Sequence, residues 1–276
     1  MRTWLITGCS TGIGRAIADA VLASGDQAVV TARKPADIAD FAERYPQSAL
    51  TVALDVSNDA SVAAAFAAAE ARFGGVDVLV NNAGYGYVAS IEEGDLDQVR
   101  AMFETNFWGA IRTTRTALPG MRAKRQGRII NISSIAGRIA NPATGYYSTS
   151  KYALEAMTSA LAREVADFGI RVTAVAAGQY RTDFSGRSLK AADGPIGDYD
   201  AGVHARIGLV KSVDGKQPGD PAKLALAMLK LADMPDPPIH LVMGPDGYAA
   251  VKGRTEEMLA SMEQHKDLTI STNFDA

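Results

Sequence analysis

The feature that most constrains this chain is a glycine-rich turn that follows a short apolar run close to Met1. The turn, residues 7–14, reads Thr-Gly-Cys-Ser-Thr-Gly-Ile-Gly, and a helix-like stretch over 15–24 follows it. Closely spaced glycines between a strand and a helix let the backbone approach an anion, and the free amides and positive dipole end of the helix attract negative charge. The pattern therefore predicts a phosphate-binding turn at the start of an α/β fold.

Short β-branched runs alternate with helix-period stretches along the rest of the chain. This alternation predicts a Rossmann-type, doubly wound, seven-stranded parallel sheet in a single domain spanning residues 1–276. The expected strands are residues 3–7, 27–32, 49–54, 76–81, 128–133, 170–176 and 239–243, and the expected helices after the first are 60–73, 148–168 and 221–232.

Two stretches depart from this alternation. Residues 178–219 contain several glycines, two prolines and little periodicity, and a loop of that length in a compact domain is often functional. Residues 245–276 form a C-terminal extension in which we expect a helix over 253–266 and then a polar tail.

Composition excludes several classes of function. The chain is 47% hydrophobic and 21% charged with a net charge of −3, so it can bury one large core but offers no broad basic surface to a nucleic acid. The first expected strand leaves no room for a signal peptide after Met1, and no apolar run reaches membrane-spanning length, so we expect a cytoplasmic protein without membrane contact.

The sequence also predicts that no metal is bound and no disulfide forms. Cys9 is the sole cysteine, and a small residue packed under the turn is its favoured interpretation over redox control. The three histidines, His204, His240 and His265, are widely separated and lack partners at the spacing of metal ligands.

Tyr147 and Lys151 form a candidate acid/base pair. Four residues apart on a helix they share a face, and a nearby ammonium stabilises a phenolate, so we expect Lys151 to lower the pKa of Tyr147 toward neutrality. The spacing alone is weak, because Tyr and Lys at this offset occur by chance on many helix surfaces.

Together with the turn, these residues resemble the short-chain dehydrogenase/reductase family, in the branch of the hydroxysteroid and retinol dehydrogenases. The family pattern Thr-Gly-x-x-x-Gly-x-Gly is present, Asn-Asn-Ala-Gly stands at 81–84, and Ser134 precedes Tyr147 by thirteen residues. The resemblance covers about residues 3 to 245 and implies a catalytic tetrad of Asn106, Ser134, Tyr147 and Lys151.

The resemblance gives each tetrad residue a role. Tyr147 would donate or accept the substrate proton, and Ser134 would hydrogen-bond the developing oxyanion, with Ser133 a less suitable alternative because its spacing is off by one. Lys151 would also bind the nicotinamide ribose, and Asn106 would hold a water beside it.

The end of the second expected strand favours NADP over NAD. NAD-binding relatives usually carry an acidic residue where this chain has Ala32, and Arg33 follows as a bidentate phosphate partner. The family implies cofactor contacts from Gly8, Ser10, Thr11, Gly12, Ile13, Gly14, Arg33, Asp55, Val56, Asn82, Ala83, Gly84, Tyr147, Lys151, Gly178 and Thr182. One departure from the family is Ala177, where proline commonly precedes the glycine.

These features predict an NADP-dependent oxidoreductase that acts on a carbonyl or secondary alcohol, favouring a hydrophobic small molecule. In this family the 178–219 segment covers the substrate, and Tyr180, Phe184, Tyr199 and Ile207 could line it or simply pack it onto the body. The alternative is a dinucleotide-sensing regulator or scaffold without turnover; enoyl reductases and epimerases on this scaffold fit less well. The family also implies a homodimer or homotetramer.

Overall fold

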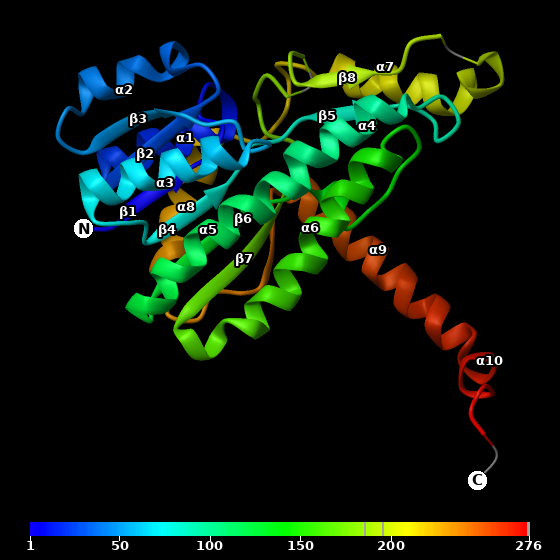
Figure 1. Ribbon diagram of the computed structural model, residues 1–276. Helices are drawn as coiled ribbons and strands as arrows, with labels where there is room; N and C mark the ends of the chain where they lie inside the picture. Colours follow the sequence, from blue (N-terminus) through cyan, green and yellow to red (C-terminus); the bar gives the residue numbers. More distant parts are fainter. Residues whose placement is uncertain (185, 195, 275–276) are drawn as a thin grey trace.

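Within residues 1–184, 186–194 and 196–274, which the computed structural model describes, seven parallel strands form one sheet (Figure 1). The order is β3-β2-β1-β4-β6-β7-β9. The seven strands are β1 Thr3–Ile6, β2 Gln27–Ala32, β3 Ala49–Ala53, β4 Val78–Asn81, β6 Gly127–Ile132, β7 Ile170–Ala177 and β9 His240–Met243. All seven expected strands are confirmed, with ends displaced by a residue or two. The doubly wound α/β fold is therefore as predicted.

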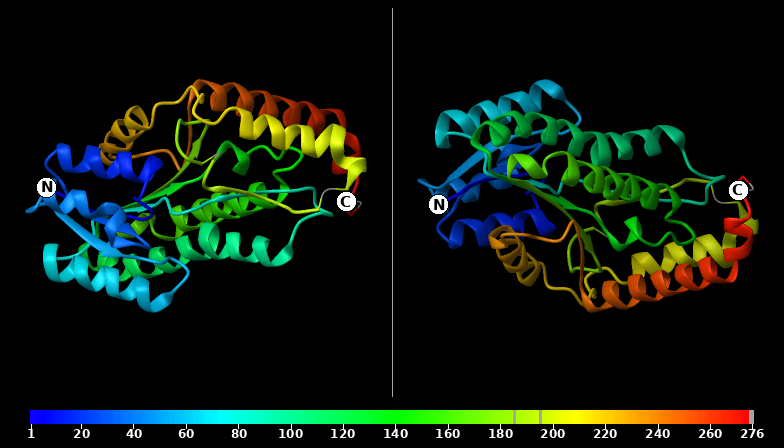
Figure 2. Two further views of the ribbon diagram at one scale, coloured as in Figure 1. Left: turned by 90° about the horizontal axis from the view of Figure 1, so that it is seen from above. Right: turned by 90° about the horizontal axis from the view of Figure 1, so that it is seen from below.

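Helices cover both faces of this sheet (Figure 2). One face packs against α1 and α8 through Ile17, Val21, Leu224 and Met228, and the other packs against α3, α5 and α6. The helices are α1 Gly12–Ala23, α2 Ala39–Arg44, α3 Asp59–Phe73, α4 Leu96–Phe103, α5 Gly109–Lys124, α6 Gly145–Glu164, α7 Ala205–Ser212, α8 Pro221–Asp233, α9 Pro245–Gln264 and α10 Lys266–Ile270. Because both faces are covered, strands such as β1 and β4 are buried at every position and read as continuous apolar runs.

The strand order reverses between β1 and β4, and this point positions the site. In open α/β sheets, ligands bind outside the carboxyl ends of the strands at such a switch point. Here Thr7 leaves β1 beside the end of β4, and its backbone N–H donates to the Val80 carbonyl over 3.0 Å. The glycine turn and the 81–84 motif therefore meet at this edge.

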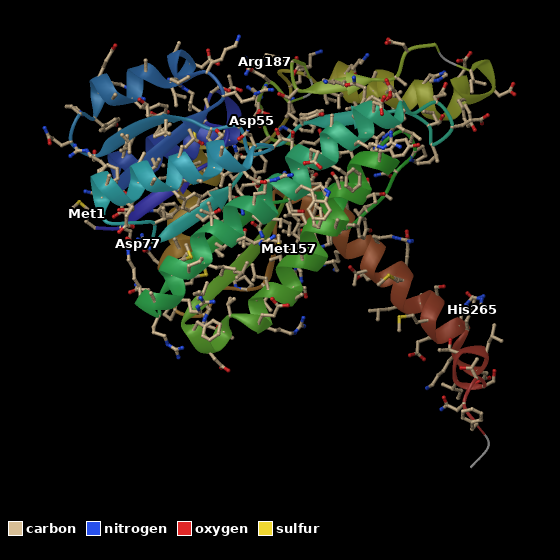
Figure 3. The ribbon with its side chains drawn as sticks, in the orientation of Figure 1. Met1, Asp55, Asp77, Met157, Arg187 and His265 are labelled. Atoms are coloured by element: carbon tan, nitrogen blue, oxygen red, sulfur yellow. The ribbon has the colours of Figure 1, made fainter. Side chains whose placement is uncertain are left out.

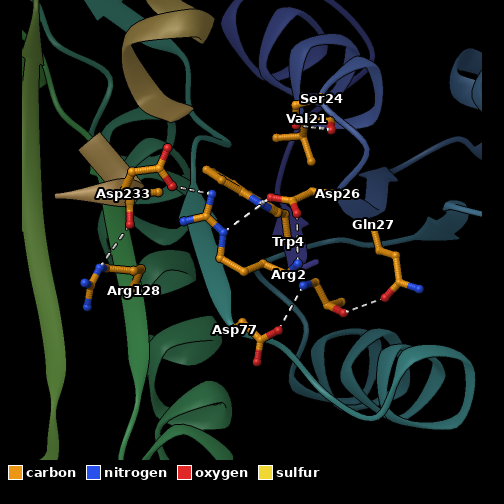
Figure 4. Close-up of polar contacts among 11 residues, drawn as sticks. Arg2, Trp4, Val21, Ser24, Asp26, Gln27, Asp77, Arg128 and Asp233 are labelled. Carbon is orange, nitrogen blue, oxygen red and sulfur yellow. Dashed lines mark hydrogen bonds and ion pairs between the residues drawn. The ribbon is translucent and has the colours of Figure 1, made fainter. Parts of the chain in front are cut away.

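A polar cluster holds the opposite, amino-terminal edge (Figure 4). Trp4 Nε1 and the Arg2 backbone N–H both donate to Asp26, each over 2.9 Å, and the Arg2 guanidinium pairs with Asp233 at 2.8 Å. These contacts tie β1 to the start of β2 and to the end of α8, far from the carboxyl edge.

The 178–219 segment is more regular than expected. It contains β8, Leu189–Ala191, which pairs in parallel with β5, Gly86–Val88, and it also contains α7. Each strand is three residues long, too short to show a period in the sequence. The segment therefore forms a small second sheet with the chain that follows β4.

The C-terminal helix begins earlier than predicted. The sequence suggested a helix from 253, but α9 starts at Pro245 and is followed by the short α10 in place of a purely polar tail. Pro245 suits the first helical position, which needs no amide donor. In Figure 1 the two helices extend away from the sheet, and several of their apolar side chains are exposed: Met258, Leu259, Met262 and Leu268. Across the described residues, none of the helices combines the length and apolarity needed to cross a bilayer.

Candidate functional site

The glycine turn forms a backbone cradle at the end of β1. Gly8 and Gly12 adopt φ of 73° and 64°, the left-handed region in which a side chain is strained. Thr11 is the N-cap of α1, and no acidic residue lies in the first turn of that helix. The positive end of α1 therefore has no carboxylate on its own first turn to neutralise it.

Asn82 locks this turn onto the end of β4. Its Nδ2 donates to the Thr7 and Gly8 carbonyls over 2.8 and 3.0 Å, and its backbone N–H donates to the Thr7 hydroxyl over 2.9 Å. Gly14 lies against this lock: a Cβ atom there would collide with Asn82 Nδ2 and lie 2.5 Å from the Gly8 carbonyl oxygen. The third glycine is therefore required by packing around the cradle.

Asn106 lies in a π-helical turn, Glu104–Trp108, between α4 and α5, whereas the sequence indicated only a helix. Its side chain accepts from Tyr85 N–H over 3.0 Å and donates to the Tyr85 carbonyl over 2.9 Å and to Ser150 Oγ over 3.2 Å. π-Helical turns often occur at functional sites. This one joins the β4 loop to α6, the helix that carries Tyr147 and Lys151.

Tyr147 is buried, and its pKa is opposite to our expectation. Burial raises the pKa of Tyr147 to about 12, although a hydrogen bond with Ser134 acts to lower it. The predicted depression by Lys151 is wrong for this structure, because Lys151 Nζ lies 5.9 Å from the centre of the Tyr147 ring and donates to the Ile132 carbonyl over 2.9 Å. The phenol is therefore held in its protonated form.

Lys151 is also buried, and burial lowers its pKa to about 8, against the opposing charge of Glu155. Its ammonium and the Asn106 side chain both border Gly84, where a Cβ would lie 3.6 and 3.0 Å from Lys151 Nζ and Asn106 Oδ1. The two residues thus meet beside the 81–84 motif. Val56, Ala83, Asn106 and Lys151 line one narrow space.

Glu155 is a buried charge that the sequence reasoning missed. It lies one helical turn after Lys151, and its Oε2 pairs with Arg138 Nη2 at 2.7 Å and with His240 Nδ1 at 2.8 Å. These partners come from distant parts of the chain, so spacing could not identify them. Glu155 is therefore a buried carboxylate, paired with Arg138 and His240, one helical turn from Lys151 on α6.

Arg33 and Asp55 lie at the carboxyl ends of β2 and β3. Arg33 is exposed and forms no ion pair with any described residue. Asp55 accepts from Ser57 through both N–H and Oγ, over 2.9 and 2.6 Å, and these bonds, with Arg33 nearby, lower its pKa. The exposed guanidinium is free to bind an anion.

Gly178 and Thr182 begin the 178–219 segment beside the turn. A Cβ at Gly12 would lie 3.3 Å from Thr182 Cβ, which shows that Thr182 sits over the cradle. Asp246, which the sequence reasoning also missed, accepts from Gln179 N–H over 2.9 Å. The start of α9 therefore fixes the turn after β7.

The four residues that could line the 178–219 segment, Tyr180, Phe184, Tyr199 and Ile207, have different environments. Phe184 lies on the Tyr147 ring at a centroid separation of 5.6 Å. Tyr180 pairs with Gly219 at the base of the segment, Tyr199 donates to Glu92 Oε2 over 2.7 Å, and Ile207 is half-buried in α7. Among these, Phe184 is the one that contacts a tetrad residue.

Hydrogen bonds of His204 connect the 178–219 segment to the chain that follows β5. His204 lies 2.8 Å from Glu93 Oε1 and 2.7 Å from Asp200 Oδ1, and these hydrogen bonds raise the pKa of His204.

Nearby, a cavity of about 550 Å³ opens between the β5–α4 connection and β8, and its lining includes Tyr87 and Lys190. In the part of the chain that the structure describes, no three His, Cys, Asp or Glu side chains are placed to hold a metal.

Of the other residues expected to contact a cofactor, Ser10 and Ile13 belong to the cradle, and Ile13 packs onto the α1–α8 core.

Cys9 is fully buried, donates from Sγ to the Ile6 carbonyl over 3.2 Å, and has a pKa that burial raises to about 12. A buried thiol of this kind is unreactive, in agreement with the packing interpretation. The side chains around the carboxyl edge appear in Figure 3, where Asp55 and Arg187 are labelled at the top.

Comparisons with known proteins agree with this geometry. A family model described as short chain dehydrogenase matches residues 2–193. An oxidoreductase of Botryotinia fuckeliana is 34% identical over 98% of this chain and 99% of its own length. Retinol dehydrogenase 8 of Homo sapiens is 39% identical over 68% of this chain and 62% of its own. The crystal structure of a short-chain dehydrogenase from Streptomyces avermitilis superposes with a TM-score of 0.92 at 36% identity, covering 99% of this chain and all of that one.

Proposed function

Since this chain belongs to the short-chain dehydrogenase family, we propose that it transfers hydride between NADP(H) and a carbonyl or secondary alcohol of a hydrophobic small molecule. One observation carries the proposal: a buried, protonated Tyr147, whose pKa the Ser134 side chain acts to lower, shares a helix face with Lys151 at the strand edge that holds the glycine cradle. An acid, an oxyanion donor and an anion cradle are the parts that carbonyl reduction requires.

The dinucleotide would supply the hydride, and the chain would manage the proton and the charge. In reduction, Tyr147 donates its O–H proton to the carbonyl oxygen, whose negative charge Ser134 stabilises through its hydroxyl. A raised pKa keeps Tyr147 protonated at neutral pH. In the reverse direction the same phenol would have to lose its proton, which needs a cation nearby.

Lys151 would position the cofactor, and Asn106 would hold the backbone around it. Lys151 Nζ borders Gly84 and donates to a backbone carbonyl, so its two remaining N–H groups are available to ribose hydroxyls. The Asn106 side chain forms its hydrogen bonds with Tyr85 and Ser150. These bonds support a role in fixing the backbone that surrounds Lys151.

The apolar surroundings support a hydrophobic substrate. Tyr87, Val99, Met102 and Tyr147 form a buried cluster onto which Phe184 packs, so the phenol faces apolar side chains from α4, β5 and the 178–219 segment. Similarity to a retinol dehydrogenase points the same way. We assign residues 178–219 as the substrate cover on this basis.

A cofactor titration followed by a turnover screen tests the proposal. Purified protein is titrated with NADPH and NADH by nicotinamide fluorescence, and the tighter cofactor is then used with a panel of hydrophobic ketones and aldehydes. We expect tighter binding of NADPH and measurable turnover. Binding without turnover on a broad panel would instead favour a sensor or scaffold.

Replacing Arg33 with alanine should change cofactor preference. Loss of one charge-assisted phosphate contact costs about 1.5–3 kcal/mol, so NADPH affinity should fall roughly 10- to 100-fold, while NADH affinity stays unchanged. Parallel fluorescence titrations measure both. Lys34→Ala, the neighbouring exposed cation, is the matched control and should leave both affinities near the wild-type values; equal losses for NADPH and NADH in Arg33→Ala would contradict the assignment.

Glu155→Gln should shift the alkaline limb of the pH profile. Lys151 acts as a cation, and its pKa of about 8 already includes support from Glu155. Removing that carboxylate lowers the Lys151 pKa further, so activity should decline at a lower pH than in the wild type. Profiles of kcat/KM from pH 6 to 10 measure the shift, with Glu164→Gln, exposed on the same helix, as control. An unmoved alkaline limb would show that Lys151 protonation does not govern the rate.

A further inference from the structure

Arg187 reaches from the 178–219 segment to the glycine cradle. Its Nη2 donates to the hydroxyl of Thr11 over 3.1 Å, a contact between residues 176 positions apart. Arg187 forms no ion pair with any residue that the structure describes, and Figure 3 shows it where this segment meets the β1–α1 region. An exposed guanidinium is thus held over the turn by a single neutral partner.

This placement is electrostatically unfavourable without an anion. A cation close to a helix N-terminus meets the positive end of the dipole, and the first turn of α1 contains no acidic residue that would offset it. Thr11 makes no capping bond to the described amides of α1, so its hydroxyl is turned to Arg187. The cradle amides, the helix dipole and the guanidinium all favour negative charge at one place.

The same segment also reaches the candidate catalytic residues. Thr182 sits over Gly12, the Phe184 ring packs against the Tyr147 ring at a centroid separation of 5.6 Å and a tilt of 50°, and β8 begins two residues after Arg187. An anion bound between Arg187 and the cradle would therefore hold this segment against both the turn and the phenol.

We propose that Arg187 binds the pyrophosphate of the dinucleotide and so couples cofactor binding to closure of the 178–219 segment over Tyr147. The inference rests on the proposed dinucleotide function. It gives Arg187 a task distinct from that of Arg33, which lies at the end of β2 and is assigned to the 2′-phosphate. A guanidinium suits this task because its N–H groups can bridge oxygens of both phosphates.

Arg187→Ala, with Arg187→Lys as a charge-preserving variant, tests the assignment. Because the pyrophosphate is common to both cofactors, NADPH and NADH affinities should fall together, by roughly tenfold in Arg187→Ala and less in Arg187→Lys. Arg206→Ala, an exposed cation on α7, is the matched control and should keep wild-type affinities. Thermal unfolding of each variant checks that the fold is intact.

Closure is measured by chymotrypsin digestion, since Tyr180, Phe184 and Tyr199 offer cleavage sites in this segment. Saturating cofactor should protect the segment in the wild type and in Arg206→Ala, but much less in Arg187→Ala at equal occupancy. Unchanged affinity and protection in Arg187→Ala would overturn the inference, and a loss confined to NADPH would overturn the pyrophosphate assignment. A wild-type protein that binds neither cofactor would instead refute the proposed function itself.

Discussion

Tyr147→Phe is expected to lose nearly all turnover and to bind the dinucleotide as tightly as the wild type. Phenylalanine keeps the ring that packs against Phe184 but has no proton to give to the carbonyl oxygen. Removing a positioned general acid typically costs 10²- to 10⁴-fold in rate, and we expect about 10³-fold here. Steady-state kcat with the best ketone and fluorescence titration of the cofactor measure the two effects separately.

The control for this variant is Tyr152→Phe on the same helix. Tyr152 is 43% exposed, so loss of its hydroxyl should leave kcat and binding unchanged. Near-normal turnover in Tyr147→Phe would exclude this phenol as the acid and would require another proton donor near Ser134. A fall in cofactor affinity comparable to the fall in kcat would instead indicate that the phenol serves binding.

The sheet could be predicted from the sequence because its strands are buried on both faces. Such strands read as uninterrupted β-branched runs between helices, and the predicted strand 27–32 has the same bounds as β2. The two strands of the small sheet could not be found this way, because three residues carry no usable period. The start of α9 was missed because Gly-Pro-Asp-Gly at 244–247 reads as a turn, although Pro245 opens the helix.

Motif order is enough to propose the candidate site residues, but it does not predict their electrostatics. The sequence places Tyr147 and Lys151 on one helix face, but it does not show that both are buried or that Lys151 donates to Ile132. Burial reverses the expected direction of the Tyr147 pKa. The roles of Glu155 and Arg187 could not be predicted for another reason. Glu155 pairs with His240, 85 positions away, and Arg187 donates to Thr11, 176 positions away.

The reversed pKa has a consequence for catalysis. A phenol at about pKa 12 and an ammonium at about pKa 8 leave Tyr147 protonated and Lys151 largely cationic at neutral pH. That pair of states suits reduction, where a proton is donated. Oxidation would require the phenolate, which becomes accessible only if bound cofactor brings the Lys151 charge closer to Tyr147.

Gly14→Ala is expected to weaken binding of both NADPH and NADH more than any substitution of an exposed cation near the cradle. The added methyl group would collide with Asn82 Nδ2 and lie 2.5 Å from the Gly8 carbonyl oxygen, so the cradle backbone or the Asn82 lock must move. Overpacking of this kind costs about 1–3 kcal/mol. If the displaced cradle cannot bind a pyrophosphate, the loss in affinity should approach or exceed roughly 100-fold.

Gly253→Ala provides a matched control, because a Cβ at Gly253 in α9 meets no described atom within 4 Å. That variant should bind both cofactors normally and gain up to about 1 kcal/mol of stability from its better helix propensity. Fluorescence titration and thermal unfolding are measured for both variants. A folded Gly14→Ala protein with wild-type affinity would show that the Asn82 lock can relax without disturbing the cradle, and the requirement for glycine would then lie in folding alone.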